Sequence, residues 1–424
     1  MSQASGSFRN GPFSWLGHLS KPERRTMAAA FGGWALDAMD VQMFSLVIPA
    51  LISVWGLTRG EAGAIGTAAL VISAVGGWLG GFLADRFGRV RVLQASILWF
   101  AGFTLLSGLS QNVEQLFASR ALMGLGFGGE WAAGAVLLGE TMQPAYRGRA
   151  LGLMQAGWAI GWGAAAISYA VLFSVLPTDL AWRALFFVGV APAVFVFFLR
   201  RLVPESAVYL QAKDSGERGA FSEIFQPPLR RVTILGALVG TGAQGGYNAI
   251  TTWLPTFLRT ERGLSVLDSS GYLAVLIAGS FTGYLSGGSL SDRLGRRRTF
   301  LLFAICAGSI VVIYTAVPFG NGAMLVLGFP LGFFGAGVFS GMGPFFTEQF
   351  PTRVRGVGQG FTYNVGRAIG ALFPALVGVL SGYFGLGWAI GLFASVAYAI
   401  MAVAAFMLPE TSGKALEEIP PATL

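Results

Sequence analysis

Three carboxylates lie deep inside apolar stretches of the sequence, where a charged side chain is costly. Asp37 and Asp40 fall in "WALDAMDVQMFSLVIPALISVWG" (34–56), and Glu130 falls in "RALMGLGFGGEWAAGAVLLGE" (120–140). A charge at mid-bilayer costs about 2.5–3.5 kcal/mol on insertion scales, so such residues usually have a function. Asp37 and Asp40 are three residues apart and share one side of a helix. Two carboxylates in a poorly solvated site disfavour double ionisation, which suits proton exchange near neutral pH. All three are therefore predicted proton-coupling residues.

Two arginines are the complementary cations within apolar stretches. Arg367 stands in "YNVGRAIGALFP", and Arg120 lies about one turn into its own stretch. A planar guanidinium can hold a carboxylate through two parallel hydrogen bonds. We expect both arginines to bind a substrate carboxylate. The alternatives are a permanent ion pair of Arg367 with Asp37 or Asp40, and a purely structural role for Arg120; Glu130 could likewise be a fixed partner for a neighbouring helix.

The composition places these charges in a membrane protein. The 424 residues are 54% hydrophobic and 11% charged, the mean hydropathy is +0.65, and a soluble domain carries about 25% charged residues. The sequence predicts an all-α integral membrane protein whose first apolar segment directs insertion. The single cysteine, Cys306, and the single histidine, His18, exclude an internal disulfide and disfavour a zinc or Cys/His catalytic site. We expect no cofactor, no metal site and no enzymatic activity.

Twelve apolar runs of about 20 residues are long enough to cross a bilayer. They lie near 27–54, 62–84, 92–110, 115–139, 150–174, 182–202, 231–258, 269–290, 299–318, 323–346, 356–382 and 387–408. The expected domains are an N-terminal tail (1–25), a six-helix bundle (26–202), a polar linker (203–230), a second six-helix bundle (231–408) and a C-terminal tail (409–424). One arrangement puts both tails, the linker and 22 of the 28 Lys and Arg residues on one side. The positive-inside rule then predicts that both termini are cytoplasmic, with the protein in a bacterial inner membrane.

Two loop motifs recur at nearly one offset, which indicates a duplicated six-helix unit. "GGFLADRFGRVRV" follows span two and "GGSLSDRLGRRRT" follows span eight, with Asp85 and Asp292 207 residues apart. "ETMQPAYRGR" and "EQFPTRVRGV" follow spans four and ten, with Glu140 and Glu348 208 apart. Transporters commonly contain two such halves with a substrate site between them. The basic residues are spread over short loops between the spans, and this distribution argues against a nucleic-acid-binding surface.

These motifs, with "PES" after span six, resemble the major facilitator superfamily over nearly the whole chain. The stretches 120–140 and 360–378 resemble the organic-anion:proton symporters, of which the sialate and monocarboxylate symporters are closest and the aromatic-acid symporters next. Those families often have D-G-[FY]-D in span one. Here the stretch reads "DAMD", so both carboxylates are present but the Gly-aromatic pair is not. The aromatic-acid symporters carry an arginine where this chain has Arg367.

The resemblance implies roles for further residues. Spans five, seven and eleven are expected to line a central cavity, and their polar and aromatic residues become predicted substrate contacts, with packing as the alternative: Gln155, Trp158, Trp162, Gln244, Tyr247, Asn248, Tyr363 and Asn364. The loop residues are expected to form ion pairs that join the halves when the cytoplasmic side is closed: Asp85, Arg86, Arg89, Glu140, Arg147, Asp292, Arg293, Arg296, Glu348 and Arg355.

The leading hypothesis is a carrier, working as a single chain in the bilayer, that moves a small carboxylate inward with a proton by alternating access. It predicts acid-stimulated uptake that collapses with a protonophore, and loss of uphill accumulation in Asp40→Asn. A proton-coupled exporter of a metabolite or drug, a sugar or polyol symporter, and a nutrient sensor without transport are the alternatives. Sugar porters would have little use for Arg367, and the paired glutamines typical of their seventh helix are absent. The sequence leaves open which organic anion is carried.

Overall fold

The computed structural model describes residues 14–143, 146–201, 203, 221–227, 229–351 and 354–411. Within these ranges the chain is helical, with no strand. The first half contains η1 (Ser14–His18), α1 (Lys21–Trp55), α2 (Arg59–Phe87), α3 (Arg89–Leu109), α4 (Val113–Thr141), α5 (Arg147–Val175) and α6 (Thr178–Arg201). The second half contains η2 (Phe221–Phe225), α8 (Leu229–Thr260), α9 (Val266–Leu294), α10 (Arg296–Ala316), α11 (Asn321–Gln349), α12 (Arg355–Gly370), α13 (Leu372–Phe384) and α14 (Leu386–Met407).

Each of the twelve predicted spans corresponds to an observed helix, so the predicted fold class is confirmed. Span eleven alone is divided, into α12 and α13, at Ala371. The helices extend beyond the apolar runs because polar capping residues begin them. At α1, for example, the Ser20 side chain accepts from the Glu23 amide while the Glu23 carboxylate accepts from the Ser20 amide. Helix α1 therefore starts inside the predicted tail. The tails and the 203–230 linker fall largely outside the described residues.

Among the described residues, nine helices are long and apolar enough to cross a membrane by composition alone. Helices α4, α6 and α8 are not among the nine. Helix α8 has a low mean hydropathy because it carries polar residues, namely Thr241, Gln244, Asn248 and Thr251, and it is buried along nearly its whole length. Polar groups at membrane depth face protein or a cavity rather than lipid. Its composition thus reflects a central position in the molecule.

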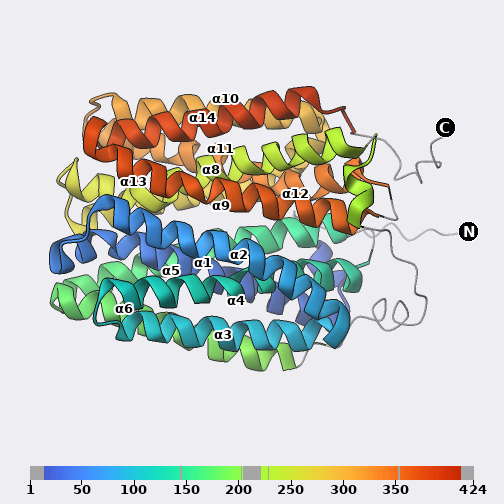
Figure 1. The fold of residues 1–424 in the computed structure, drawn as a ribbon, viewed down its shortest axis with the longest axis horizontal. Helices are drawn as coiled ribbons and strands as arrows, with labels where there is room; N and C mark the ends of the chain where they lie inside the picture. The colour runs from blue at the N-terminus through green and yellow to red at the C-terminus, as the bar shows by residue number, and fades with distance from the viewer. Residues whose placement is uncertain are drawn as a thin grey trace, which may run out of the picture.

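The helices form two bundles that lie side by side with parallel long axes (Figure 1). The first bundle packs α1 on α5, α2 on α4 and α3 on α6; the second repeats these pairs as α8 on α12, α9 on α11 and α10 on α14. The repeated loops also share a backbone shape. Gly88 has φ 102° and ψ 149°, and Gly295 has φ 91° and ψ 157°. A positive φ is unfavourable for residues other than glycine, so both loops require glycine, as a duplication predicts.

The two halves meet along α2 with α12 and α13, α5 with α9, and α1 with α8. We call the end where α1 begins and α14 ends the terminal face, and the end where α1 ends and α2 begins the opposite face. The halves are closed towards the opposite face. Arg59 of α2 lies 4.0 Å from Glu261, which follows α8. A Cβ atom added to Gly63 of α2 would lie 2.8 Å from the Pro374 carbonyl oxygen of α13, so the two backbones are in close contact there.

Candidate functional site

A cavity lies between the halves, halfway along the helices. Helices of both bundles contribute to its wall, which consists of Trp34, Val41, Leu70, Phe127, Gln155, Trp158, Gln244, Tyr247, Asn248, Tyr284, Phe339, Tyr363 and Arg367. Its free volume is about 30 Å³, which leaves room for water but is far below the roughly 300–1,000 Å³ of a small-molecule site. The halves therefore fit closely around the cavity in this conformation.

Most of the predicted substrate contacts lie on this wall: Gln155, Trp158, Gln244, Tyr247, Asn248, Tyr363 and Arg367. Three do not. Trp162 is fully buried, with its ring 6.5 Å from that of Tyr247. Asn364 donates from Nδ2 to the Gly360 carbonyl, and its amide oxygen would lie 2.6 Å from a Cβ atom added to Gly77 of α2. Arg120 lies inside the first bundle.

Arg367 is the cation of the cavity wall. Its side chain is 3% exposed, and its guanidinium carbon lies 4.0 Å from the centroid of the Phe127 ring. A cation over an aromatic face is stabilised by the ring quadrupole, more so when desolvated. The Nη1 atom has no hydrogen-bond partner among the described residues, and the Asp37 carboxylate interacts electrostatically with the guanidinium. Since Phe127 and Asp37 belong to the first half, Arg367 is held by both halves.

Asp40 and Asp37 have different partners, although both are fully buried on α1. Oδ2 of Asp40 lies 2.6 Å from Nη1 of Arg120, and Oδ1 accepts from the Thr104 hydroxyl at 2.7 Å. Three residues correspond to about 300° around a helix, so the two side chains are about 60° apart. That angle directs Asp40 towards α3 and α4 within its own bundle, while Asp37 interacts with Arg367 of the other half. The expectation that both carboxylates face one cavity does not hold here.

Arg120 is enclosed by its partners. Its side chain is 2% exposed, and the Phe44 and Phe186 ring centroids lie 5.4 Å and 5.5 Å from its guanidinium carbon. A buried charge is stable only when it is paired. This geometry matches the alternative given above for Arg120, a structural role. Glu130, which is 2% exposed on α4, lies one turn from Phe127 and so on the same side of the helix, but it is not part of the cavity wall.

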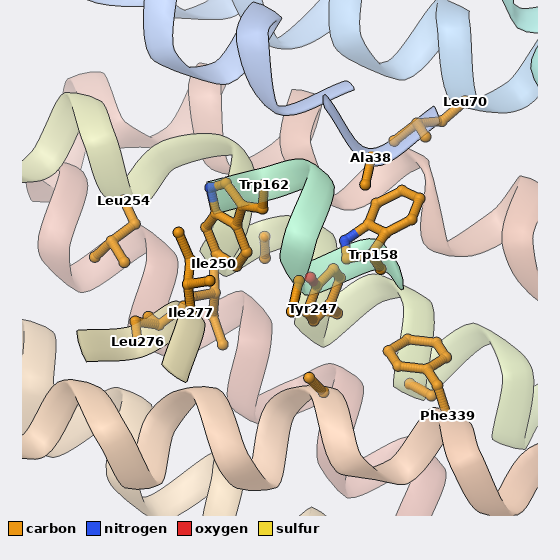
Figure 2. Close-up of a cluster of buried hydrophobic side chains, with 14 of the residues drawn as sticks. Ala38, Leu70, Trp158, Trp162, Tyr247, Ile250, Leu254, Leu276, Ile277 and Phe339 are labelled. Atoms are coloured by element: carbon orange, nitrogen blue, oxygen red, sulfur yellow. The ribbon is translucent and has the colours of Figure 1, made fainter. Parts of the chain in front are cut away.

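Aromatic rings form much of the wall. Trp34 lies 4.9 Å from Trp158 and 6.4 Å from Phe127, measured between ring centroids. Figure 2 shows Trp158 and Trp162 of α5 beside Tyr247 of α8. The Tyr247 hydroxyl and the Trp158 Nε1 atom lie close enough to interact, though without hydrogen-bond geometry. Aromatic side chains of both halves therefore line the cavity.

Sequence reasoning missed several residues of the wall: Trp34, Val41, Leu70, Phe127, Tyr284 and Phe339. A signal existed for two of them. Trp34 precedes Asp37 by three residues and Phe127 precedes Glu130 by three, so each shares a helix side with a predicted carboxylate. The others come from helices whose apolar and aromatic residues are mostly packing, and composition does not single them out.

The predicted gating residues lie at the terminal face. The side chains of Asp85, Glu140 and Arg147 are outside the described set. In the second half, Arg296 forms ion pairs with Asp292 and, at 2.9 Å, with Glu348, and Arg293 is exposed. Arg89 donates to the Ala84 carbonyl, Arg355 donates to the Phe350 carbonyl, and the Arg86 guanidinium lies over the Phe87 ring. Each of these contacts joins elements of one half.

The chain's final described residues complete this cluster. The Glu410 carboxylate accepts from the backbone amides of Arg296 at 2.9 Å and Arg297 at 3.1 Å, at the N-terminus of α10. The Thr411 hydroxyl donates to Glu348 at 2.6 Å. Anions are stabilised at helix N-termini by the free amides and the helix dipole. The segment after α14 therefore binds back onto its own bundle.

Comparison with known proteins agrees with this architecture. The family model for the Major Facilitator Superfamily matches residues 30–320, and the model "Sugar (and other) transporter" matches residues 221–422. The chain belongs to the Major Facilitator Superfamily. It is 42% identical to a "probable 4-methylmuconolactone transporter" of Cupriavidus pinatubonensis, over 96% of this chain and 95% of that one.

Other superfamily members are similar over most of the chain. The cis,cis-muconate transport protein of Acinetobacter baylyi is 32% identical over 85% of this chain and 89% of its own. The niacin transporter NiaP of the same organism is 30% identical over 91% and 94%. These relatives and the superfamily are transporters rather than enzymes, and the chain is accordingly a multi-pass membrane transporter. The resemblance inferred from its loop motifs is confirmed.

Proposed function

We propose that this transporter carries a small organic carboxylate together with a proton, by alternating access of the cavity to the two faces. The observation that carries the proposal is the position of Arg367. It is buried at the interface between the halves, with one guanidinium nitrogen directed to no protein acceptor among the described residues. A planar guanidinium suits a carboxylate, and relatives named for muconate and niacin transport are consistent with such a ligand.

Coupling to a proton follows from charge balance around Arg367. With Asp37 ionised, the Arg367 charge is compensated within the protein. An anion entering then adds a second negative charge to a desolvated site, which is unfavourable. Protonation of Asp37 removes its charge, so the substrate carboxylate becomes the partner of Arg367. Proton and anion therefore favour each other's binding, and this coupling is reciprocal.

The Asp40–Arg120 pair has a different role in this proposal. Because the pair is fully enclosed and lies within one bundle, it moves with that bundle as a unit. We assign it to the rigidity of the first bundle rather than to proton transfer or substrate binding. The loop residues of the terminal face are proposed to form ion pairs between the halves when that face closes; at a wet interface each such pair contributes about 0–1 kcal/mol and so biases the two conformations.

Uptake into proteoliposomes tests the proposal. Purified protein would be supplied with radiolabelled cis,cis-muconate, 4-hydroxybenzoate or nicotinate and an inwardly directed pH gradient. We expect accumulation of at least one of these anions, its loss with a protonophore, and an inward proton flux that depends on the anion. Concentrative uptake that ignores the pH gradient would exclude proton coupling. Accumulation only under an outwardly directed pH gradient would instead identify a proton-coupled exporter.

The orientation is proposed from the charge distribution. The loops of the terminal face carry most of the Lys and Arg residues, and such loops are retained in the cytoplasm. We therefore propose that the terminal face is cytoplasmic, in a bacterial inner membrane. Single cysteines at Arg25 and Gln111, in a Cys306→Ser background, should react with an impermeant maleimide from the inside and the outside respectively. The reverse pattern would invert the orientation.

A further inference from the structure

The interruption of span eleven lies next to Arg367 and is contacted by the other half. Helix α12 ends at Gly370, α13 begins at Leu372, and the amide of Ala371 donates to the Arg367 carbonyl at 2.9 Å. Pro374 accounts for part of the interruption, because it has no amide hydrogen to donate to the Gly370 carbonyl. Arg367 therefore occupies the last turn before a weak point in its own helix.

Thr67 of α2 contacts this weak point with both functions of its hydroxyl. Oγ1 donates to the Ala371 carbonyl at 2.7 Å and accepts from the Ala375 amide at 3.2 Å. These two backbone groups face each other one turn apart along a helix, so the hydroxyl bridges them. Ala371 is the N-cap of α13, so Thr67 of the first bundle fixes the first turn of α13, immediately after the interruption.

Close backbone contact is what allows the short threonine side chain to reach. Gly63, one turn before Thr67, leaves no room for a side chain beside Pro374. Leu70, three residues after Thr67, lies on the cavity wall. The same side of α2 thus connects the closed opposite face, the interruption in span eleven and the cavity. When the halves separate at the opposite face, this hydroxyl must leave its two partners on span eleven.

We propose that Thr67 is a positioning residue: its hydroxyl holds the opposite face closed and fixes the start of α13, next to the interruption that follows Arg367, and so positions Arg367 at the cavity. This inference rests on the proposed role of Arg367 in binding the substrate carboxylate. Opening of the opposite face breaks both hydrogen bonds, releases the hinge at Ala371 and moves Arg367 relative to Phe127. Hinges of this kind are a few residues at the ends of helices that absorb a backbone change.

The test compares Thr67→Val, which keeps the shape but removes the hydroxyl, with Thr67→Ser, which keeps the hydroxyl. Spin labels at Gln111 and Ala323, both exposed at the opposite face on different halves, report the opening distance in a Cys306→Ser background without substrate. Loss of two hydrogen bonds should raise the open population about tenfold in Thr67→Val. The KM for the transported anion should also rise about tenfold, while Thr67→Ser behaves as wild type in both measurements.

Distances and KM unchanged in Thr67→Val, or equal impairment in Thr67→Ser, would overturn the inference. If Thr67→Val does not accumulate in the membrane, Gly63→Ala provides a second route, because its methyl group would push α13 away while leaving the hydroxyl in place. Gly81→Ala is its matched control on the same helix, where nothing lies within 4 Å of the added Cβ. A distance shift in Gly63→Ala as small as that in Gly81→Ala would again overturn it. Unimpaired anion transport in Arg367→Gln, in contrast, counts against the proposed substrate site.

Discussion

The guanidinium of Arg120 on α4 and the carboxylate of Asp40 on α1 form an ion pair at 2.6 Å, and solvent reaches neither side chain to more than 2%. The pair is separated by one helical turn of α1 from Asp37, which interacts with Arg367 of the other half. Two carboxylates three residues apart in one apolar stretch thus belong to different charge networks. One network lies inside a bundle, and the other crosses the interface between the bundles.

Breaking the Asp40–Arg120 pair should destabilise the protein strongly. Asp40→Asn or Arg120→Gln leaves the other charge buried without its partner, which costs about 3–5 kcal/mol. The double variant should lose less than the sum of the two single losses. Unfolding in mixed micelles, followed by tryptophan fluorescence, measures these differences. Wild-type stability in Asp40→Asn would show that the pair is not structural.

Asp37→Asn should uncouple transport from the proton gradient. A permanently neutral side chain imitates the protonated state, so anion exchange continues but accumulation does not. In wild type, uptake should increase as the external pH falls, and a gradient of one pH unit supports at most about tenfold accumulation with one proton per anion. In Asp37→Asn the ratio should fall to about one and uptake should no longer follow pH. Internal and external radiolabel at steady state give this ratio.

The matched control for Asp37→Asn is Glu114→Gln, which removes an exposed carboxylate from the first turn of α4. It should retain both accumulation and pH dependence. Asp40→Asn, in the fraction that folds, should also retain the pH dependence, in contrast to what the sequence alone suggested. Loss of pH dependence in Asp40→Asn with retention in Asp37→Asn would reverse the assignment of the two carboxylates.

Substitution of Arg367 should weaken binding even when the charge is kept. A hydrogen bond to a charged group contributes about 1.5–3 kcal/mol, so Arg367→Gln should reduce kcat/KM by roughly 10- to 150-fold. Arg367→Lys should also be impaired, because a lysine lacks the planar fork that binds a carboxylate and stacks on Phe127. Initial uptake rates over a range of anion concentrations give these values. Arg25→Gln, an exposed arginine at the start of α1, is the control and should be neutral.

At the opposite face, Glu261 should matter more than its ion-pair partner. The Arg59–Glu261 pair is long, at 4.0 Å, and about a third exposed on both sides, so Arg59→Gln should change stability by less than about 1 kcal/mol. The Glu261 carboxylate also accepts from the backbone amides of Leu386 and Gly387 at the start of α14. Glu261→Ala should therefore cost more, about 1–2 kcal/mol. Thermal unfolding of both variants compares them, and equal effects would contradict the capping role.

The segment after α14 should stabilise the second bundle through Glu410. Its carboxylate accepts from two backbone amides at the start of α10, in the manner of a helix cap. Glu410→Gln keeps the size but removes the charge that favours the helix N-terminus, and about 0.5–1 kcal/mol should be lost. The melting temperature in detergent should fall below that of the wild type. An unchanged melting temperature would assign no stabilising role to this contact.

The helices and their repetition follow from the sequence because they depend on local composition. Long apolar runs must be helical at membrane depth, since each backbone group needs a partner within its own segment. Gly88 and Gly295 mark equivalent loops in both halves, and the structure gives them nearly the same positive φ. The sequence also predicted much of the cavity wall, including Trp158, Tyr247 and Arg367, once the loop motifs indicated which helices lie at the centre.

The need of Asp37, Asp40, Arg120 and Arg367 for partners also follows from the sequence, because hydrocarbon cannot solvate an isolated charge. The packing of the helices selects which partners they have. A periodicity of 3.6 residues places Asp37 and Asp40 on one side of α1, but an offset of about 60° between them decides which neighbouring helix each one meets. The contact of Thr67 with span eleven is equally non-local, since residues 67, 371 and 375 are brought together only when the two bundles pack against each other.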